Sequence, residues 1–178
     1  AFPICLSTQD PDEIVAAVKA IAPTFGGINL EDISAPRCFE IEERLKKELD
    51  IPVFHDDQHG TAIVVLAGII NSLKVVGKKK EDCKVVVNGA GSAGVAITRL
   101  LLRYGFKNIT MCDKSGILSK DSKDLNWMQE KMMEVTNLSG ASGTLADALK
   151  GADIFVGVSA PGIVSQDMVR SMNKDSIL

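Results

Sequence analysis

Residues 85–94 constrain the fold of this chain more than any other stretch. Three valines and Asn88 lead into the pattern Gly89-x-Gly91-x-x-Gly94, and apolar residues at helical spacing follow without a breaker as far as Arg103. A strand, a glycine turn and a helix in this order are typical of a unit that binds a dinucleotide. Gly89 would allow a sharp turn, Gly91 would leave room for a pyrophosphate, and Gly94 would let the helix pack close to the strand.

An acidic residue stands where a dinucleotide-binding sheet needs one. The next predicted strand covers residues 108–112 and ends at Asp113, 19 residues after Gly94. An acid there accepts hydrogen bonds from the adenosine ribose. The candidate cofactor contacts are the turn, the first residues of its helix, this acid and a serine after a later strand: Gly89, Gly91, Ser92, Ala93, Gly94, Asp113 and Ser159. Asp113 would repel a 2′-phosphate, which favours NAD over NADP, although Lys114 and Lys120 could soften that repulsion.

Strands and helices alternate along the whole sequence. The expected strands are 2–6, 24–30, 51–54, 85–88, 108–112 and 153–158, with another beginning at 175–178. The expected helices are 7–22, 35–50, 61–76, 95–103, 124–136, 143–150 and 166–172, and 114–123 reads as a polar loop. This alternation predicts an α/β fold of parallel sheets covered on both faces. Helix 61–76 is apolar on most sides, so we expect it to be buried between layers.

Two lobes are expected. Residues 59–178 would form a Rossmann-type, doubly wound parallel sheet that binds NAD(P), incomplete at its C-terminus. Residues 1–58 would be the C-terminal part of a smaller α/β domain for substrate and metal, with the active site between the two lobes. The sequence opens inside a strand-like run without a methionine and stops at the start of another strand. We therefore expect a piece of a longer enzyme.

Composition excludes several classes of partner. Hydrophobic residues make up 46% and charged residues 24% of the chain, which predicts a packed core, and the net charge of −3 argues against nucleic acid as a main partner. No apolar run approaches the roughly 20 residues of a membrane span, and no signal peptide is visible. The four cysteines lack a CxxC pair. Cys5, Cys83 and Cys112 are expected to be buried free thiols, which favours a reducing, cytoplasmic compartment.

Two acidic pairs each follow a predicted strand. Glu31 and Asp32 come after one strand, and Asp56 and Asp57 come after the next. Carboxyl ends of parallel strands meet at one edge of a sheet, so the two pairs can meet in space. Adjacent carboxylates repel one another unless a cation lies between them. Mg²⁺ or Mn²⁺ prefers such oxygen ligands, so the pairs favour a divalent metal site.

The simpler interpretation of these acids is that they cap helices or lie in a solvated loop. Either pair alone would favour that interpretation. Both pairs together, with His55, Gln58 and His59 beside the second and no adjacent basic residue, favour a metal site. With carboxylates available for a hard ion, we expect the histidines to orient their neighbours rather than bind the metal.

Four segments together resemble one enzyme family, malic enzyme of the bacterial type. They are FGGINLEDI (25–33), APRCFEIE (35–42), IPVFHDDQHGTA (51–62) and VVNGAGSAG (86–94). The similarity runs in order through essentially the whole chain, and four long motifs are far more specific than a glycine fingerprint.

The resemblance implies oxidative decarboxylation of (S)-malate to pyruvate and CO₂, with NAD or NADP and Mg²⁺ or Mn²⁺, in a homo-oligomer. By motif match, Glu31, Asp32 and Asp57 would bind the metal, and Asp56 would be a catalytic-site residue that steers a lysine. Hydride would pass from C2 of malate to the nicotinamide. The metal would act as a Lewis acid while CO₂ departs.

The sequence departs from the family by omission. Family members use a tyrosine and a lysine as acid and base, both upstream of residue 1, and the only tyrosine here is Tyr104 in the helix after the glycine turn. We therefore expect little turnover from this chain alone. Two alternatives stay open: a metal-free Rossmann dehydrogenase acting on another small acid, and a non-catalytic nucleotide-binding module.

Overall fold

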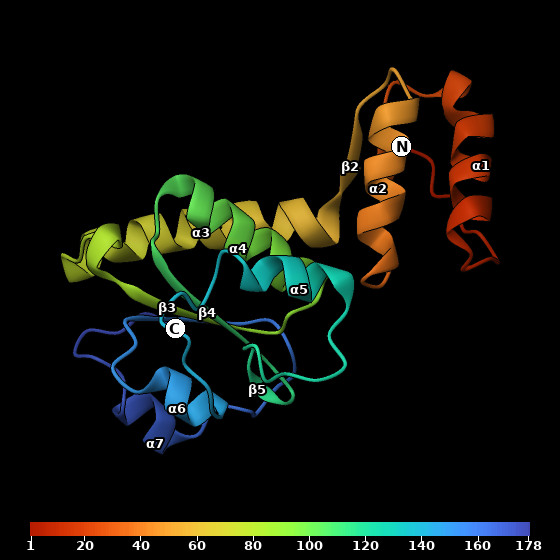
Figure 1. Cartoon of the computed structure of the whole chain (residues 1–178). Coiled ribbons are helices and arrows are strands. Elements are labelled where there is room, and N and C mark those ends of the chain that lie inside the picture. The colour runs from red at the N-terminus through yellow and green to blue at the C-terminus, as the bar shows by residue number, and fades with distance from the viewer. The chain divides into compact units, whose positions relative to one another are not determined.

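The computed structural model describes residues 1–178 and divides into two compact units, Ala1–Asp57 and Gln58–Leu178. The first unit is a small α/β structure built on two parallel strands (Figure 1). Its elements are α1 (Pro11–Ile21), a short 3₁₀ turn (Ala22–Thr24), β1 (Ile28–Leu30), α2 (Arg37–Glu48) and β2 (Val53–His55). Leu30 lies opposite His55 at the carboxyl ends of the two strands. The residues that follow both strands therefore emerge side by side.

The first unit has a compact apolar core. Both helices and both strands contribute to it, through Ile14, Val15, Val18, Leu30, Ile41, Leu45 and Val53. α1 begins where the side chain of Asp10 accepts hydrogen bonds from the N–H groups of Asp12 and Glu13, and Pro11 occupies the first turn. The apolar stripe that predicts this helix is the face that packs into the core.

Two expectations for the first part of the chain are wrong. Residues 2–6 do not form a strand, because no neighbouring strand pairs with them and their side chains are exposed. The following helix, α3 (Asp56–Val76), begins at Asp56 instead of residue 61. Asp56 and Asp57 thus lie in the first helical turn, where negative charge is favourable because the helix dipole is positive there.

The second unit is a four-stranded sheet in the order β5-β4-β3-β6. Its strands are β3 (Lys84–Asn88), β4 (Asn108–Asp113), β5 (Gly116–Ile117) and β6 (Ile154–Gly157). β3 lies at the centre and pairs in parallel with β4 and β6. β5 pairs antiparallel with β4, inside the stretch expected to be a plain loop. Ile177 forms a further parallel bridge to Ile154, where another strand is expected to begin.

Helices cover both faces of this sheet (Figure 1). α3 and α4 (Ser92–Tyr104) pack against one face and meet Val85 and Val87. α6 (Leu145–Leu149) and α7 (Gln166–Arg170) pack against the other face and meet Val86. α5 (Trp127–Met133) lies beside α4, and a 3₁₀ turn (Lys80–Asp82) precedes β3. The predicted Rossmann-type α/β fold is confirmed.

α3 is less buried than its composition predicts. Its buried residues are Gln58, Ala62, Ile69 and Leu73, whereas Ile63, Val64 and Val75 are 56%, 66% and 87% exposed. The expectation that this helix is buried between layers is wrong, because the sheet covers one side of α3 only. By length and composition α3 is long and apolar enough to cross a membrane, which differs from the prediction that no apolar run approaches that length, but one such helix is weak evidence.

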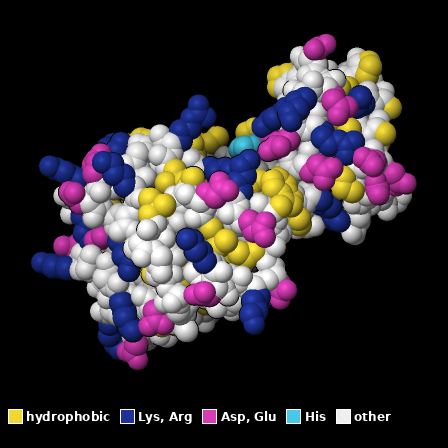
Figure 2. Space-filling view, viewed as in Figure 1, with side chains coloured by type: hydrophobic (Ala, Val, Ile, Leu, Met, Phe, Trp, Pro, Cys, Tyr) yellow, Lys and Arg dark blue, Asp and Glu magenta, His cyan; other side chains and the backbone are white.

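Charged side chains of both signs are interspersed on one face of the molecule (Figure 2). Figure 2 shows Lys and Arg alternating with Asp and Glu across the face that it presents, without a broad area of one sign. This distribution matches the small net charge of −3.

All four cysteines are free thiols. Cys38, Cys83 and Cys112 are buried, whereas Cys5 is exposed, which corrects the expectation for Cys5. Its segment forms no strand and therefore has no core to enter. Burial raises the pKa of the Cys38 thiol to about 11 and that of the Cys112 thiol to about 12.

Candidate functional site

The glycine turn between β3 and α4 leaves open space above its middle residue. Gly89 has a φ of +118°, and a methyl group on it would lie 2.7 Å from the carbonyl oxygen of Val158. A methyl group on Gly94 would collide with the carbonyl oxygen of Gly89. Around Gly91, no atom lies within 4 Å of the position that a methyl group would take. The turn is therefore tight on both sides and open over Gly91, which suits a ligand that approaches the backbone.

The N-terminus of α4 faces the same opening. The helix runs for 13 residues from Ser92, and its N-cap residue, Gly91, provides no side-chain hydrogen bond to the first turn. Ser92 and Ala93 are the first two residues of the helix. The N–H groups of a first helical turn lack partners within the helix, and the helix dipole adds positive potential there. This end of α4 can bind the phosphates of a dinucleotide.

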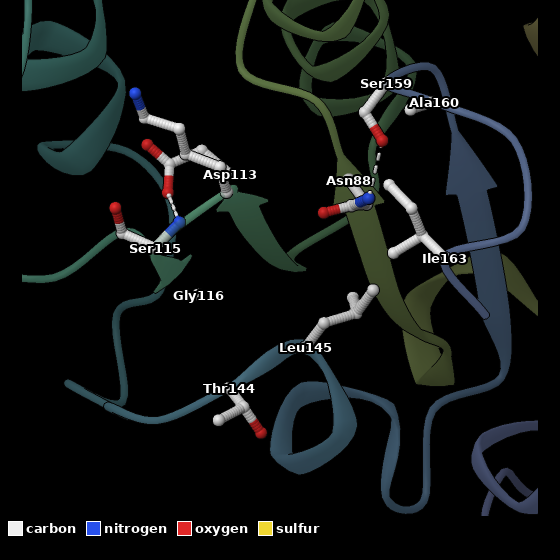
Figure 3. Close-up of a pocket in the computed structure, with 10 residues that line it drawn as sticks. Asn88, Asp113, Ser115, Gly116, Thr144, Leu145, Ser159, Ala160 and Ile163 are labelled. Carbon is white, nitrogen blue, oxygen red and sulfur yellow. Dashed lines mark hydrogen bonds between the residues drawn. The ribbon is translucent and has the colours of Figure 1, made fainter. Parts of the chain in front are cut away.

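A pocket of about 530 Å³ opens beside the carboxyl ends of β3, β4 and β6 (Figure 3). This volume lies within the usual range for small-molecule sites. Leu145 and Ile163 supply apolar walls, and Asp113 and Ser159 supply polar groups. The lining residues are Asn88, Asp113, Lys114, Ser115, Gly116, Thr144, Leu145, Ser159, Ala160 and Ile163. An apolar slot with a few polar groups at its edges suits a nucleoside.

Asp113 is held in place at the end of β4. One oxygen of its carboxylate, Oδ1, accepts a hydrogen bond from the backbone N–H of Ser115 at 2.7 Å. Its second oxygen points away from that bond (Figure 3) and can accept hydrogen bonds from a ligand. Lys114 also lines the pocket, whereas Lys120 does not.

Asn88 lines the pocket but is absent from the sequence-based site. It is the last residue of β3, is 4% exposed, and donates a hydrogen bond from Nδ2 to Oγ of Ser159 at 2.8 Å. A signal for it does exist in the sequence, because Asn88 is the one polar residue between three buried valines and the glycine turn. Its partner Ser159, a predicted cofactor contact, lies two residues after the end of the neighbouring strand, β6.

Carboxylates gather at the carboxyl edge of the first unit. The backbone N–H of Asp32 donates to Oδ2 of Asp57 at 3.0 Å. Nε2 of the fully buried His55 lies 3.4 Å from the same oxygen. β1 and β2 place these residues together although 25 positions separate Asp32 from Asp57.

The other two predicted residues are chain neighbours of this cluster, since Glu31 precedes Asp32 and Asp56 precedes Asp57. Oε1 of Glu31 accepts a hydrogen bond from Nδ2 of Asn29 at 2.9 Å, and Asp56 is exposed at the start of α3. No group of three His, Cys, Asp or Glu side chains is arranged to hold a metal ion. The donor chemistry nevertheless fits Mg²⁺ or Mn²⁺, because Asp32 and Asp57 are neighbouring hard oxygen ligands. Glu31 would have to turn from Asn29 to join them.

The fold and the pocket define a dinucleotide-binding α/β protein. The glycine turn, the open helix N-terminus and the acid that ends the next strand lie on one edge of one sheet. More particularly, the chain belongs to the malic enzyme family. The family model described as "Malic enzyme, NAD binding domain" matches residues 58–176, and "Malic enzyme, N-terminal domain" matches residues 6–46.

Individual relatives agree with this assignment. The chain is 57% identical to an NAD-dependent malic enzyme of Geobacillus stearothermophilus, over 100% of this chain and 37% of the relative. It is 49% identical to an NADP-dependent malic enzyme of Haemophilus influenzae, over 99% of this chain and 23% of the relative. The solved structure of an NAD-dependent malic enzyme from Thermotoga maritima matches with a TM-score of 0.96 and 48% identity, over 99% of this chain and 48% of that one. The chain thus spans less than half the length of these relatives.

Proposed function

We propose that this chain carries the cofactor-binding part and a share of the metal site of an enzyme that converts (S)-malate to pyruvate and CO₂ while reducing NAD. The pocket at the carboxyl edge of β3, β4 and β6 is the observation that carries the proposal. Membership of the malic enzyme family and relatives named NAD- and NADP-dependent malic enzymes support it.

In this proposal the second unit holds the dinucleotide. Gly91 would leave room for the pyrophosphate, and the N–H groups of Ser92 and Ala93 would donate hydrogen bonds to it. The apolar walls of the pocket would enclose the adenosine, and Asp113 would accept hydrogen bonds from its ribose. NAD held by these residues would supply the hydride acceptor for the oxidation of malate.

The first unit contributes to the metal and malate site. Glu31, Asp32 and Asp57 bind the cation, and Asp56 acts on a catalytic lysine. Bound there, Mg²⁺ or Mn²⁺ supplies Lewis-acid stabilisation of the negative charge that develops on malate oxygens. His55 keeps Asp57 in position, which the 3.4 Å separation between Nε2 and Oδ2 supports.

NAD is the proposed cofactor in preference to NADP. Asp113 places a negative charge where NADP would carry its 2′-phosphate. Two acidic residues, Asp121 and Asp124, and a single lysine, Lys123, line a second pocket that begins at Ser115. This local excess of acid opposes an additional phosphate. Relatives of both cofactor types are known, so the choice rests on these side chains.

We further propose a cytoplasmic homo-oligomer. The buried free thiols at Cys38, Cys83 and Cys112 support a reducing compartment.

Cofactor binding is tested by calorimetric titration of this chain with NAD. We expect Gly91→Val to lower the affinity for NAD at least about tenfold, because the new side chain fits the fold but fills the space proposed for the pyrophosphate. Gly68→Val is the matched control, since Gly68 also has nothing within 4 Å of its would-be methyl group and lies in α3, away from the pocket. Failure of the unmodified chain to bind NAD, or equal binding by Gly91→Val, would refute the proposal.

Turnover is tested on the enzyme as its gene encodes it. With Mn²⁺ and NAD, malate should yield NADH and pyruvate in a 1:1 ratio, and chelation of the metal should stop the reaction. A protein that binds NAD but neither binds Mn²⁺ nor turns over malate would instead be a metal-free dehydrogenase or a nucleotide-binding module.

A further inference from the structure

Asn88 and Ser159 join the ends of two neighbouring strands at the pocket. Asn88 ends β3 opposite Gly157, the last residue of β6, and Ser159 follows two positions later. The backbone N–H of Val158 donates to the carbonyl oxygen of Asn88 at 2.9 Å. The side-chain bond from Asn88 to Ser159 at 2.8 Å lies beside it. Two hydrogen bonds therefore hold the start of the loop after β6 against the start of the glycine turn.

The direction of the side-chain hydrogen bond determines which donor and acceptor groups remain available to a ligand. Oγ of Ser159 accepts the hydrogen bond from Nδ2 of Asn88, so the hydroxyl hydrogen of Ser159 stays free to donate. The amide oxygen of Asn88 points away from Ser159, toward the side of the pocket where Asp113 lies (Figure 3). The pocket therefore presents a donor and an acceptor close together on one side.

Folding alone does not require an amide at position 88. Asn88 is 4% exposed and continues a strand in which Val85, Val86 and Val87 are fully buried. A buried polar group is costly unless it is hydrogen-bonded. Replacement of both hydrogen-bonding partners by apolar groups of similar shape can leave the stability of the fold nearly unchanged. A role in ligand binding accounts for a polar pair at this position.

We propose that Asn88 and Ser159 together recognise a ribose hydroxyl of the bound dinucleotide, which rests on the proposed cofactor function. The hydroxyl would accept a hydrogen bond from Ser159 and donate one to the amide oxygen of Asn88. A ribose hydroxyl can do both, whereas a phosphate oxygen only accepts and would be repelled by that amide oxygen. Asn88 has a second role as a positioning residue, because its N–H directs the hydroxyl of Ser159.

The first test is the variant Ser159→Ala, titrated with four ligands: NAD, AMP, 2′,3′-dideoxy-AMP and nicotinamide mononucleotide. We expect the affinity for NAD to fall about three- to tenfold, as for the loss of one hydrogen bond. If the adenosine ribose is the partner, the affinity of the variant for AMP falls by the same factor and its affinity for the dideoxy analogue is unchanged. If the nicotinamide ribose is the partner, the affinity for nicotinamide mononucleotide falls by that factor and the affinity for AMP is unchanged. Either result supports the proposal.

The second test separates positioning from folding. Asn88→Ala should weaken NAD binding. In the double variant with Ser159→Ala, the fold-loss in affinity for NAD should be smaller than the product of the two single losses, because Asn88 acts partly through Ser159. Ser139→Ala, an exposed serine outside the pocket, is the control. Melting temperatures identify any unfolded variant, and Ser159→Ala alone still decides the question if Asn88→Ala does not fold.

Two results would overturn the inference. One is unchanged NAD affinity in Ser159→Ala while the unmodified chain binds NAD. The other is an equal loss for NAD and for the dideoxy analogue, which would indicate a structural effect. An unmodified chain that binds no NAD would instead remove the cofactor function on which the inference rests.

Discussion

The backbone N–H of Asp32 donates a hydrogen bond to the Oδ2 atom of Asp57 at 3.0 Å. The parallel pairing of β1 with β2 brings these residues together, because Leu30 and His55 lie opposite each other just before them. Asp32 has a φ of +55°, an uncommon conformation in which its backbone nitrogen meets the carboxylate of Asp57. Two of the three proposed metal-binding residues are therefore joined directly.

This pairing predicts that Asp57→Asn weakens Mn²⁺ binding more than about tenfold, since the variant loses a ligand charge and alters the contact with Asp32. Mn²⁺ binding to this chain can be measured by electron paramagnetic resonance. Asp50→Asn, which changes an exposed acid in the same unit, is the matched control and should bind Mn²⁺ as the unmodified chain does. Equal affinities in both variants would remove Asp57 from the metal site.

Asp113→Ala should raise the affinity for NADP relative to NAD by about tenfold. The substitution removes the negative charge that faces the 2′-phosphate and also a hydrogen-bond acceptor for the ribose of NAD. Dissociation constants for both nucleotides, measured on the same preparation, give the ratio. Asp167→Ala alters a largely exposed acid on α7 and should leave the ratio unchanged. A constant ratio in Asp113→Ala would exclude this residue from cofactor choice.

The Asp153 carboxylate makes the stability of the second unit dependent on acid pH. Burial by itself raises the pKa of Asp153, but hydrogen bonds from Lys78 at 2.8 Å, from the backbone N–H of Lys84 at 2.9 Å and from Asn173 at 3.0 Å outweigh it and lower the pKa. The folded state therefore binds protons less readily than the unfolded chain. This stabilisation is complete above the unfolded pKa of about 3.9 and is lost as the pH falls through the lowered pKa.

Asp153→Asn should lower the free energy of unfolding by about 2 kcal/mol at pH 7, as expected for hydrogen bonds to a charged group, and by less at pH 3. Urea denaturation at both pH values measures the difference. Asp167→Asn disrupts the largely exposed Asp167–Arg170 pair and should change stability by less than about 0.5 kcal/mol. A loss that is the same at both pH values would contradict the role of the Asp153 charge.

The thiols should differ in reactivity toward Ellman's reagent at pH 7.5. Cys5 is exposed, whereas Cys38 and Cys112 are buried and have pKa values raised by burial to about 11 and about 12, so very little of their reactive thiolate form is present. One thiol of the native chain should react quickly, and all four should react in denaturant. Cys5→Ser should abolish the fast phase. A fast phase that persists in this variant would show that a buried thiol becomes accessible.

Local patterns in the sequence predict most elements of this fold but not their burial or their exact limits. The valines before Gly89, and the spacing of apolar residues in α1 and α4, identify strand and helix because packing and turn geometry depend on near neighbours. Residues 2–6 show the limit of such patterns, since a strand-like run becomes a strand only beside a partner. The composition of α3 likewise predicts burial, but burial depends on which of its sides the sheet covers.

The same division holds for the candidate site. The order of strands and helices, the glycine turn and the acid at position 113 follow from the sequence, because each depends on residue type at short spacing. The pairing of Asp32 with Asp57 and of Asn88 with Ser159 was decided only by the tertiary structure. The partners in these pairs are 25 and 71 positions apart in the chain. Strand register brings such residues together, and register results from the packing of whole sheets and helices, which no local pattern encodes.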